Sequence, residues 1–184
     1  MGMEGEAEKP KTESDDPVAC AKTPPPRCPA CEGEGAEVPH VTPRFTLKSP
    51  FRKSVLEQGH YHFCATPTCD VVYYACDGQH QFTTAQLINR VTVKDEDPKT
   101  PLCYCYRILK EHALRQLEKQ GNSDVVALIK GRMQERPSQC LKFNPRGHCC
   151  TGDIEQWLQK QGVELAENPE GDDCCRSESD GSSR

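Results

Sequence analysis

Cysteine is the residue that most limits what this chain can fold into, because 13 cysteines occur among 184 residues. Two of them, Cys103 and Cys105, stand one residue apart before a predicted helix, in the stretch LCYCYRILKEHAL. A disulfide between such near neighbours is badly strained. The acidic start, MGMEGEAEKPKTESDD, does not read as a signal peptide, so we expect a reducing compartment. The cysteines therefore predict metal or redox chemistry rather than a disulfide scaffold.

Composition narrows the class of protein further. Only 35% of the residues are hydrophobic, so a sizeable core needs help, which bound metals can supply. The formal net charge of -5 argues against a general nucleic-acid binder, which normally shows a basic face. No apolar run approaches the length of a membrane span. We expect a cytoplasmic protein without nucleic-acid or membrane partners.

The composition divides the chain into four segments. Residues 1–26 and 164–184 are rich in charged residues, Pro, Gly and Ser, and predict disordered tails. Residues 27–97 predict a β-rich part, since HYHFC and DVVYYAC carry β-branched and aromatic residues bounded by turn formers. Residues 98–163 predict three short helices, the first with Leu109, Ala113 and Leu117 on one face and Gly121 at its end. The fold class expected is α+β.

Two local features refine this division. The stretch TLKSPFRKSVLEQG, residues 46–59, predicts a short helix with Leu47, Phe51 and Val55 turned inward. The stretch KDEDPKTP, residues 94–101, predicts a polar linker between the two parts. In the helical part, Ser123 and Thr151 are the expected caps of the second and third helices.

The first set of cysteines lies in the β-rich part. CPAC and FCATPTC present Cys28, Cys31, Cys64 and Cys69 on two turns, and two such turns make the closed four-cysteine site that structural zinc prefers. The alternative is that some of these cysteines are small buried hydrophobic residues. His60 and His62 share one face of a strand, and we expect exposed polar positions there rather than ligands.

The second set combines the CYCY stretch with CLKFNPRGHCC, which supplies Cys140, Cys149 and Cys150. A three-helix bundle would bring both loops to one end, where helix N-termini offer partial positive charge. Thiolates suit both zinc and iron–sulfur clusters, so the spacing leaves the two open. The basic residues near these loops would steer an acidic redox partner, offset the charge of a cluster, or lie in solvent; they are Arg107, Lys110, Lys142 and Arg146.

CPAC, FCATPTCDVVYY, CYCY and CLKFNPRGHCC, in this order, resemble the N-terminal domain of the CopZ copper-chaperone family over roughly residues 27–162. That domain carries one mononuclear zinc and one [2Fe–2S] cluster, and its cluster part is similar to the bacterioferritin-associated ferredoxin domain. The resemblance implies zinc at residues 27–97, on Cys28, Cys31, Cys64 and Cys69. It implies a [2Fe–2S] cluster at residues 98–163, on Cys103, Cys105, Cys140 and Cys150, with Cys149 an adjacent cysteine that does not ligate.

The chain also departs from that family. It contains no M-x-C-x-x-C copper loop, so copper delivery does not carry over directly. Cys174 and Cys175, in the acidic tail, are either a loose metal-binding pair or functionless.

Three functions compete at this point. The first is an iron–sulfur and zinc protein with a one-electron, metal-handling role and a redox or copper-trafficking protein partner. The second is a two-zinc module that binds a protein and has no redox activity. The third, an enzyme with Cys149 as nucleophile beside His148, is disfavoured, because sequence neighbours rarely form a catalytic pair and no phosphate loop or triad order accompanies them. We expect no enzyme.

Overall fold

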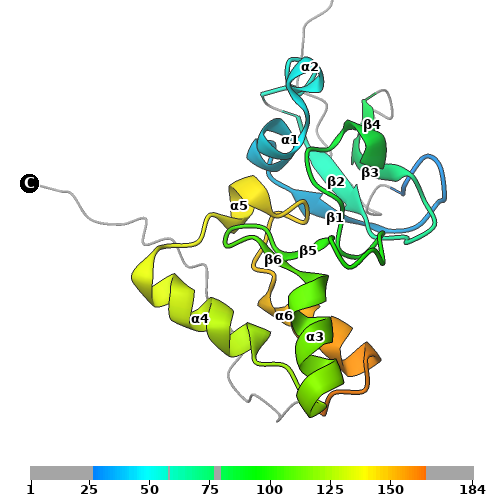
Figure 1. Ribbon diagram of the computed structural model, residues 1–184. Coiled ribbons are helices and arrows are strands. Elements are labelled where there is room, and N and C mark those ends of the chain that lie inside the picture. The colour runs from blue at the N-terminus through cyan, green and yellow to red at the C-terminus, as the bar shows by residue number, and fades with distance from the viewer. Residues whose placement is uncertain (1–26, 58, 77–79, 165–184) are drawn as a thin grey trace, which may run out of the picture.

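The computed structural model describes residues 27–57, 59–76 and 80–164. Both predicted tails lie outside this part of the chain, apart from Glu164, and so do Cys174 and Cys175. Figure 1 shows a sheet half, with its short helices, above a half built mainly of helices. The fold is α+β, as the sequence predicts.

The sheet half is built on four antiparallel strands in the order β1-β2-β3-β4. Their bounds are β1, Gly35–Val38; β2, Tyr61–Cys64; β3, Val71–Ala75; and β4, Gln81–Thr83. The register places Phe63 opposite Tyr73 and His62 opposite Tyr74. Strands β2 and β3 are buried along their whole length and confirm the two predicted strands. The outer strands were not predicted, because GAEV and QFT are short and lack a run of β-branched residues.

The predicted helix over residues 46–59 is wrong in its bounds. The structure has two short helices instead, α1 at Val41–Thr46 and α2 at Ser49–Arg52, with Pro50 in the first turn of α2. Leu47 stands between them in an extended conformation and pairs with Leu87, beyond the 3-10 helix η1 (Thr84–Gln86). Leu47 and Val55 are nevertheless buried, so the apolar pattern identified the core but not the element that carries it.

The helical half begins with a hairpin rather than a helix. Strand β5, Pro101–Cys103, pairs with β6, Ile108–Leu109, and α3 starts only at Lys110. The helices are α3, Lys110–Gln120; α4, Val125–Glu135; the short α5, Cys140–Phe143; and α6, Thr151–Lys160. Gly121 ends α3 with a φ of 70°, the left-handed conformation expected of a glycine at that position.

The core of this half is formed by the predicted helix faces. Ala113, Ile129, Ile154 and Leu158 are at most 1% exposed and pack together with Trp157. Ser123 and Thr151 are not the caps that the sequence suggested. Asp124 is the N-cap of α4, with the Val125 N–H donating to Oγ of Ser123 at 3.4 Å, and Cys150 is the N-cap of α6, whose first residue is Thr151. None of the helices within the described residues is long and apolar enough to cross a membrane.

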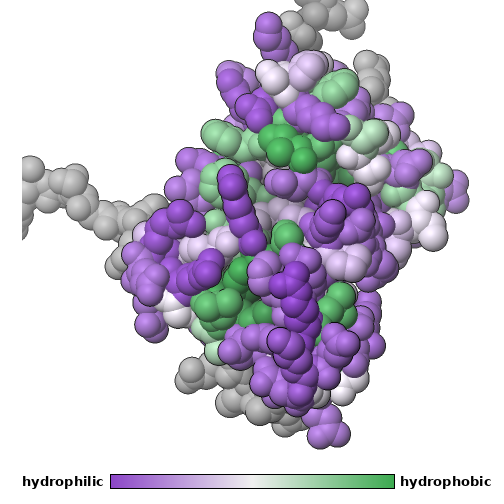
Figure 2. Space-filling model, in the orientation of Figure 1, coloured by the Kyte–Doolittle hydropathy of each residue, from purple (hydrophilic) through white to green (hydrophobic). Residues whose placement is uncertain are grey.

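The two halves are joined by several contacts and not only by the chain between them. Helix α1 packs on α5, where the Thr42 hydroxyl donates to the carbonyl of Leu141 at 2.6 Å. The Tyr73 hydroxyl, from the sheet, donates to the carbonyl of Pro145 at 2.8 Å. Figure 2 shows hydrophilic side chains over most of the visible face, with apolar side chains confined to small areas of each half.

Candidate metal centres

The first cysteine set is assembled by the ends of the sheet strands. Cys28 and Cys31 lie on a tight turn before β1, in which the N–H of Cys28 donates to the Gly33 carbonyl at 2.9 Å. Cys64 is the last residue of β2, and Cys69 precedes β3 after the turn that starts at Thr66. Because β1 and β2 are neighbours, with Gly35 opposite Cys64, the two turns meet at one end of the sheet.

The geometry of this set fits one tetrahedral ion. All four sulfurs lie within 4.8 Å of one another. The sulfur of Cys28 is 3.8 Å from that of Cys69, and the sulfur of Cys31 is 3.6 Å from that of Cys64. Four thiolates at about 2.3 Å from a zinc ion would themselves be separated by about 3.8 Å. The four cysteines therefore form a site of the structural zinc type, with three members buried and Cys31 half-buried.

The electrostatics of the set differ from residue to residue. A hydrogen bond of 3.3 Å joins Sγ of Cys31 to the Thr66 hydroxyl and lowers the pKa of the Cys31 thiol to about 6. Burial raises the pKa of Cys69 to about 12 and also raises the pKa of Cys28. The Cys28 and Cys69 thiols therefore hold their protons at neutral pH until a metal ion replaces them.

His62 is the one sequence expectation near this site that is wrong. Its residue exposure is 6%, its ring stacks on Tyr74 with centroids 5.6 Å apart, and burial lowers its pKa. His60 is exposed as expected, with its ring 3.3 Å from the Glu37 carboxylate. The two histidines were expected to share an exposed face, but their shared face is covered at His62 by the neighbouring strand.

The second cysteine set comes from three separate segments. Cys103 ends β5, Cys105 lies in the turn before β6, Cys140 begins α5, and Cys150 directly precedes α6. The sulfurs of Cys105 and Cys140 are 3.7 Å apart, and the N–H of Gln139 donates to the Cys105 sulfur at 3.4 Å. Three members are buried and Cys105 is half-buried, so the site has one side near solvent.

The four thiols form a ring in which each lies close enough to two others to shift their pKa values. The neighbouring pairs are Cys103–Cys105, Cys105–Cys140, Cys140–Cys150 and Cys150–Cys103, and the pair Cys105–Cys140 is hydrogen-bonded. The neighbouring thiols of Cys105 and Cys150 lower the pKa of Cys103 to about 4, whereas the same pairings raise the pKa of Cys105 and of Cys150. The ring therefore tolerates one thiolate easily and resists further ionisation unless a cation is present.

Cys149 is placed apart from this ring. Its sulfur lies 3.2 Å from the Thr151 hydroxyl, and it is disulfide-bonded, whereas the four cysteines of the ring are free. The structure thus brings together the set that the resemblance implied, Cys103, Cys105, Cys140 and Cys150. Their role as cluster ligands stays a prediction.

The basic residues near the ring are only partly those that the sequence suggested: Arg107 is exposed on the Cys105 turn, as the sequence suggested, but two others are not free. Lys110 is fully buried, and Arg146 forms an ion pair with Asp153, so neither is available to a partner. Two arginines that sequence reasoning missed take their place. Arg132 of α4 donates to the Tyr106 carbonyl at 3.3 Å, and Arg136, which directly follows α4, donates to the Cys105 carbonyl at 3.0 Å; both arginines are exposed. No motif pointed to them, because they come from a helix about 30 residues away in the sequence.

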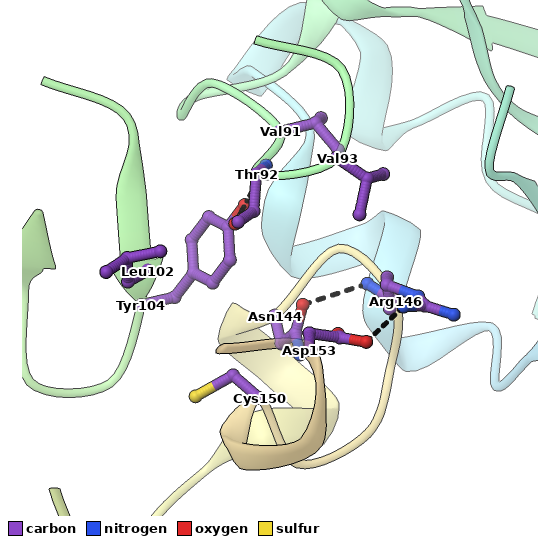
Figure 3. Close-up of a pocket in the computed structure, with 9 residues that line it drawn as sticks. All are labelled: Val91, Thr92, Val93, Leu102, Tyr104, Asn144, Arg146, Cys150 and Asp153. Carbon is purple, nitrogen blue, oxygen red and sulfur yellow. Dashed lines mark hydrogen bonds and ion pairs between the residues drawn. The ribbon is translucent and has the colours of Figure 1, made fainter. Parts of the chain in front are cut away.

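A small cavity lies beside the second site, between the two halves. Figure 3 shows its walls, with the Arg146–Asp153 ion pair on one side and Tyr104 and Thr92 on the other. Its volume of about 10 Å³ is at the lower limit of what one water molecule needs. The sulfur of Cys150 points away from the other labelled side chains in this view. This cavity is therefore too small to be a substrate pocket.

Taken together, the fold and the first site define a zinc-binding domain followed by a helical domain rich in thiols. Residues 25–88, which include all four cysteines of the first site, match a family model described as a zinc binding domain of the CopZ type. The copper chaperone CopZ of Archaeoglobus fulgidus is 32% identical over 133 residues, which cover 71% of this chain and 60% of that protein.

A solved structure agrees with this relationship. The X-ray structure of the Archaeoglobus fulgidus CopZ N-terminal domain matches with a TM-score of 0.60 and 29% identity, over 76% of this chain and 99% of that one. The chain is thus homologous to the CopZ N-terminal domain, as its motifs predicted, and it contains the zinc-binding domain of that family. It spans about 60% of the length of the curated relative.

Proposed function

We propose that this is a metal-handling protein in which the helical half holds a [2Fe–2S] cluster and exchanges single electrons, while zinc stabilises the sheet half. The observation that carries the proposal is the ring of four thiols gathered from three separate segments. Cys103, Cys105, Cys140 and Cys150 would be the ligands. When bound, the cluster would supply one-electron chemistry at a potential set by its hydrogen bonds and burial.

The shape of the ring favours two irons over one zinc ion. Within the described residues, only the first cysteine set has all its sulfurs within 4.8 Å of one another, the compact arrangement that a single ion requires. The second set is more open, and the ligands of a two-iron cluster are divided between two metal ions. The N–H of Gln139 and the N-terminal end of α6 also direct partial positive charge toward these sulfurs.

The surroundings of Cys105 support an exchange of electrons at this point of the surface. Cys105 is the half-buried member of the ring, and Arg107, Arg132 and Arg136 lie on or beside its turn. Within the described residues, none of these three arginines forms an ion pair with a carboxylate. An acidic protein surface is the partner that such a site would attract.

The homology supports a copper-related role as a proposal. The relative is a copper chaperone, so we propose a non-enzymatic, copper-related role with a redox or copper-trafficking protein as partner. Copper delivery itself is not part of the proposal, because the chain carries no M-x-C-x-x-C loop.

The test is metal analysis of the protein purified without oxygen. We expect iron, sulfide and zinc in a ratio of about two to two to one, with the absorption of a [2Fe–2S] cluster. C103S and C140S should lose the iron and keep the zinc. Two zinc ions per chain, with no iron after anaerobic reconstitution, would instead establish the two-zinc interaction module, since thiolates suit both metals.

A further inference from the structure

Lys94, in the linker between the two halves, reaches into the zinc site. Its ammonium donates to the carbonyl of Thr66 at 2.7 Å and to the carbonyl of Cys69 at 2.8 Å. It also lies 3.9 Å from the sulfur of Cys64. Lys94 thus contacts the turn that joins two of the four cysteines, at both of its ends.

These contacts suit a zinc site specifically. Four thiolates around one divalent ion leave a net negative charge, which a nearby ammonium offsets. The two carbonyl contacts hold the turn in the conformation that brings Cys64 and Cys69 to the same ion. Groups that orient metal ligands in this way commonly contribute 10- to 100-fold to metal affinity.

The same linker is also hydrogen-bonded to the helical half. The Lys110 ammonium, buried at the start of α3, donates to the Asp95 carbonyl and to the Glu96 carboxylate, both at 2.8 Å. Two residues before Lys94, the Thr92 hydroxyl donates to the Pro101 carbonyl at 2.6 Å, and the N–H of Thr92 donates to the Tyr104 hydroxyl at 3.0 Å. Pro101 begins β5, and Tyr104 stands between Cys103 and Cys105. The segment from Thr92 to Glu96 therefore touches the zinc turn and the cysteine hairpin at once.

We propose that Lys94 positions the ligands of the zinc site and couples zinc binding to the order of the Cys103–Cys105 hairpin. With zinc bound, the turn holds Lys94, and the linker is fixed against β5 and Lys110. Without zinc, the turn has no ion to organise it, Lys94 loses its fixed acceptors, and the hairpin loses one of its supports. Coupling of this kind is reciprocal, so a disordered linker also weakens zinc binding. The proposal rests on the zinc site and does not need the iron–sulfur cluster.

The experiment uses the full chain with zinc as the only metal. K94M removes the ammonium but keeps the length of the side chain, and K94R keeps a charge. K99M is the matched control, because Lys99 is an exposed lysine of the same linker. Zinc affinity is measured by competition with a chromogenic chelator, and hydrogen–deuterium exchange is followed in peptides covering residues 101–109. Peptides of α4 serve as the internal reference.

We expect K94M to weaken zinc binding by about tenfold and K94R by less, with K99M unchanged. Exchange in residues 101–109 should become faster in K94M while α4 keeps its rate. Unchanged zinc affinity in K94M would overturn the positioning role, and unchanged or uniformly faster exchange would overturn the coupling. Should K94M not fold, the wild-type chain answers the same question, because stripping its zinc must accelerate exchange in the hairpin before α4. If the protein proved not to bind an iron–sulfur cluster, each of these expected results would still stand.

Discussion

The sulfur of Cys105 lies 3.7 Å from the sulfur of Cys140, which is 35 positions further along the chain. This approach closes the ring of thiols, because Cys105 lies on the hairpin and Cys140 at the start of α5, between α4 and α6. Cys150 completes the ring from the start of α6, whereas the adjacent Cys149 contacts Thr151. Two neighbouring cysteines therefore have different surroundings, which makes them a matched pair for mutation.

The first prediction concerns this pair. We expect C150S to lose iron and C149S to retain it, because in the proposed cluster serine at position 150 would remove one of four ligands and serine at position 149 would remove none. The measurement is the iron-to-protein ratio after anaerobic reconstitution, together with the absorption spectrum. Zinc content, measured in the same samples, controls for folding of the sheet half. Iron retained by C150S and lost by C149S would reverse the assignment.

The second prediction concerns protons at the zinc site. Cys28 and Cys69 have raised pKa values because they are buried, so both are protonated thiols at pH 7 in the metal-free protein. Zinc binding must displace both protons, and its affinity therefore falls by about tenfold per proton for each pH unit of acidification. Below pH 6 the slope should steepen by one more proton, since the pKa of Cys31 is about 6. Calorimetry in buffers of different ionisation enthalpy measures the number of protons, and a pH-independent affinity would contradict the prediction.

Local sequence signals identified most of the buried elements. HYHFC and DVVYYAC became β2 and β3 because buried central strands carry continuous β-branched and aromatic residues. Gly121 and the apolar face of α6 were predictable for the same local reason. The cysteines of the first site were also predictable, since two turns that each carry a close pair of cysteines are typical of a four-cysteine zinc site.

Features fixed by contacts between distant segments were not predictable. His62 is buried because β3 places Tyr74 over its ring, and a single strand pattern cannot show that neighbour. KDEDPKTP reads as a solvated linker, yet Lys110 is fully buried against Asp95 and Glu96. Arg132 and Arg136 reach the Cys105 turn only because α4 folds back on it. In each case the deciding partner lies elsewhere in the sequence.

The third prediction concerns packing behind the zinc site. A methyl group at Gly35 would lie 2.0 Å from the hydroxyl oxygen of Tyr74, which is 1% exposed and surrounded by Cys28, Cys64 and Val71. Gly35→Ala should therefore destabilise the zinc-loaded protein by about 1–3 kcal/mol, because Tyr74 has to move within a packed core. Gly131→Ala is the control. Nothing lies within 4 Å of that added methyl on α4, and removing a helical glycine should stabilise by about 0.5–1 kcal/mol. Thermal and urea unfolding measure both changes, and equal effects would contradict the packing argument.

The fourth prediction uses small electron acceptors of opposite charge in place of the partner. Arg107 is exposed on the Cys105 turn, beside the arginines of α4, in a chain whose formal net charge is -5. A positive surface at this point attracts anions. The reduced protein should therefore react faster with an anionic complex such as ferricyanide than it would without this attraction, most clearly at low ionic strength. R107E should slow that reaction by about two- to threefold and speed the reaction with cationic hexaammineruthenium(III) by a similar factor.

Both effects of R107E should disappear as added salt screens the charges, since the Debye length is about 3 Å at 1 M. K53E provides the control, because Lys53 is an exposed lysine of the sheet half and its reversal changes the net charge by the same amount. Stopped-flow oxidation of the reduced protein gives the rates. Equal effects from K53E and R107E would show that only total charge matters and that the Cys105 turn is not where electrons leave.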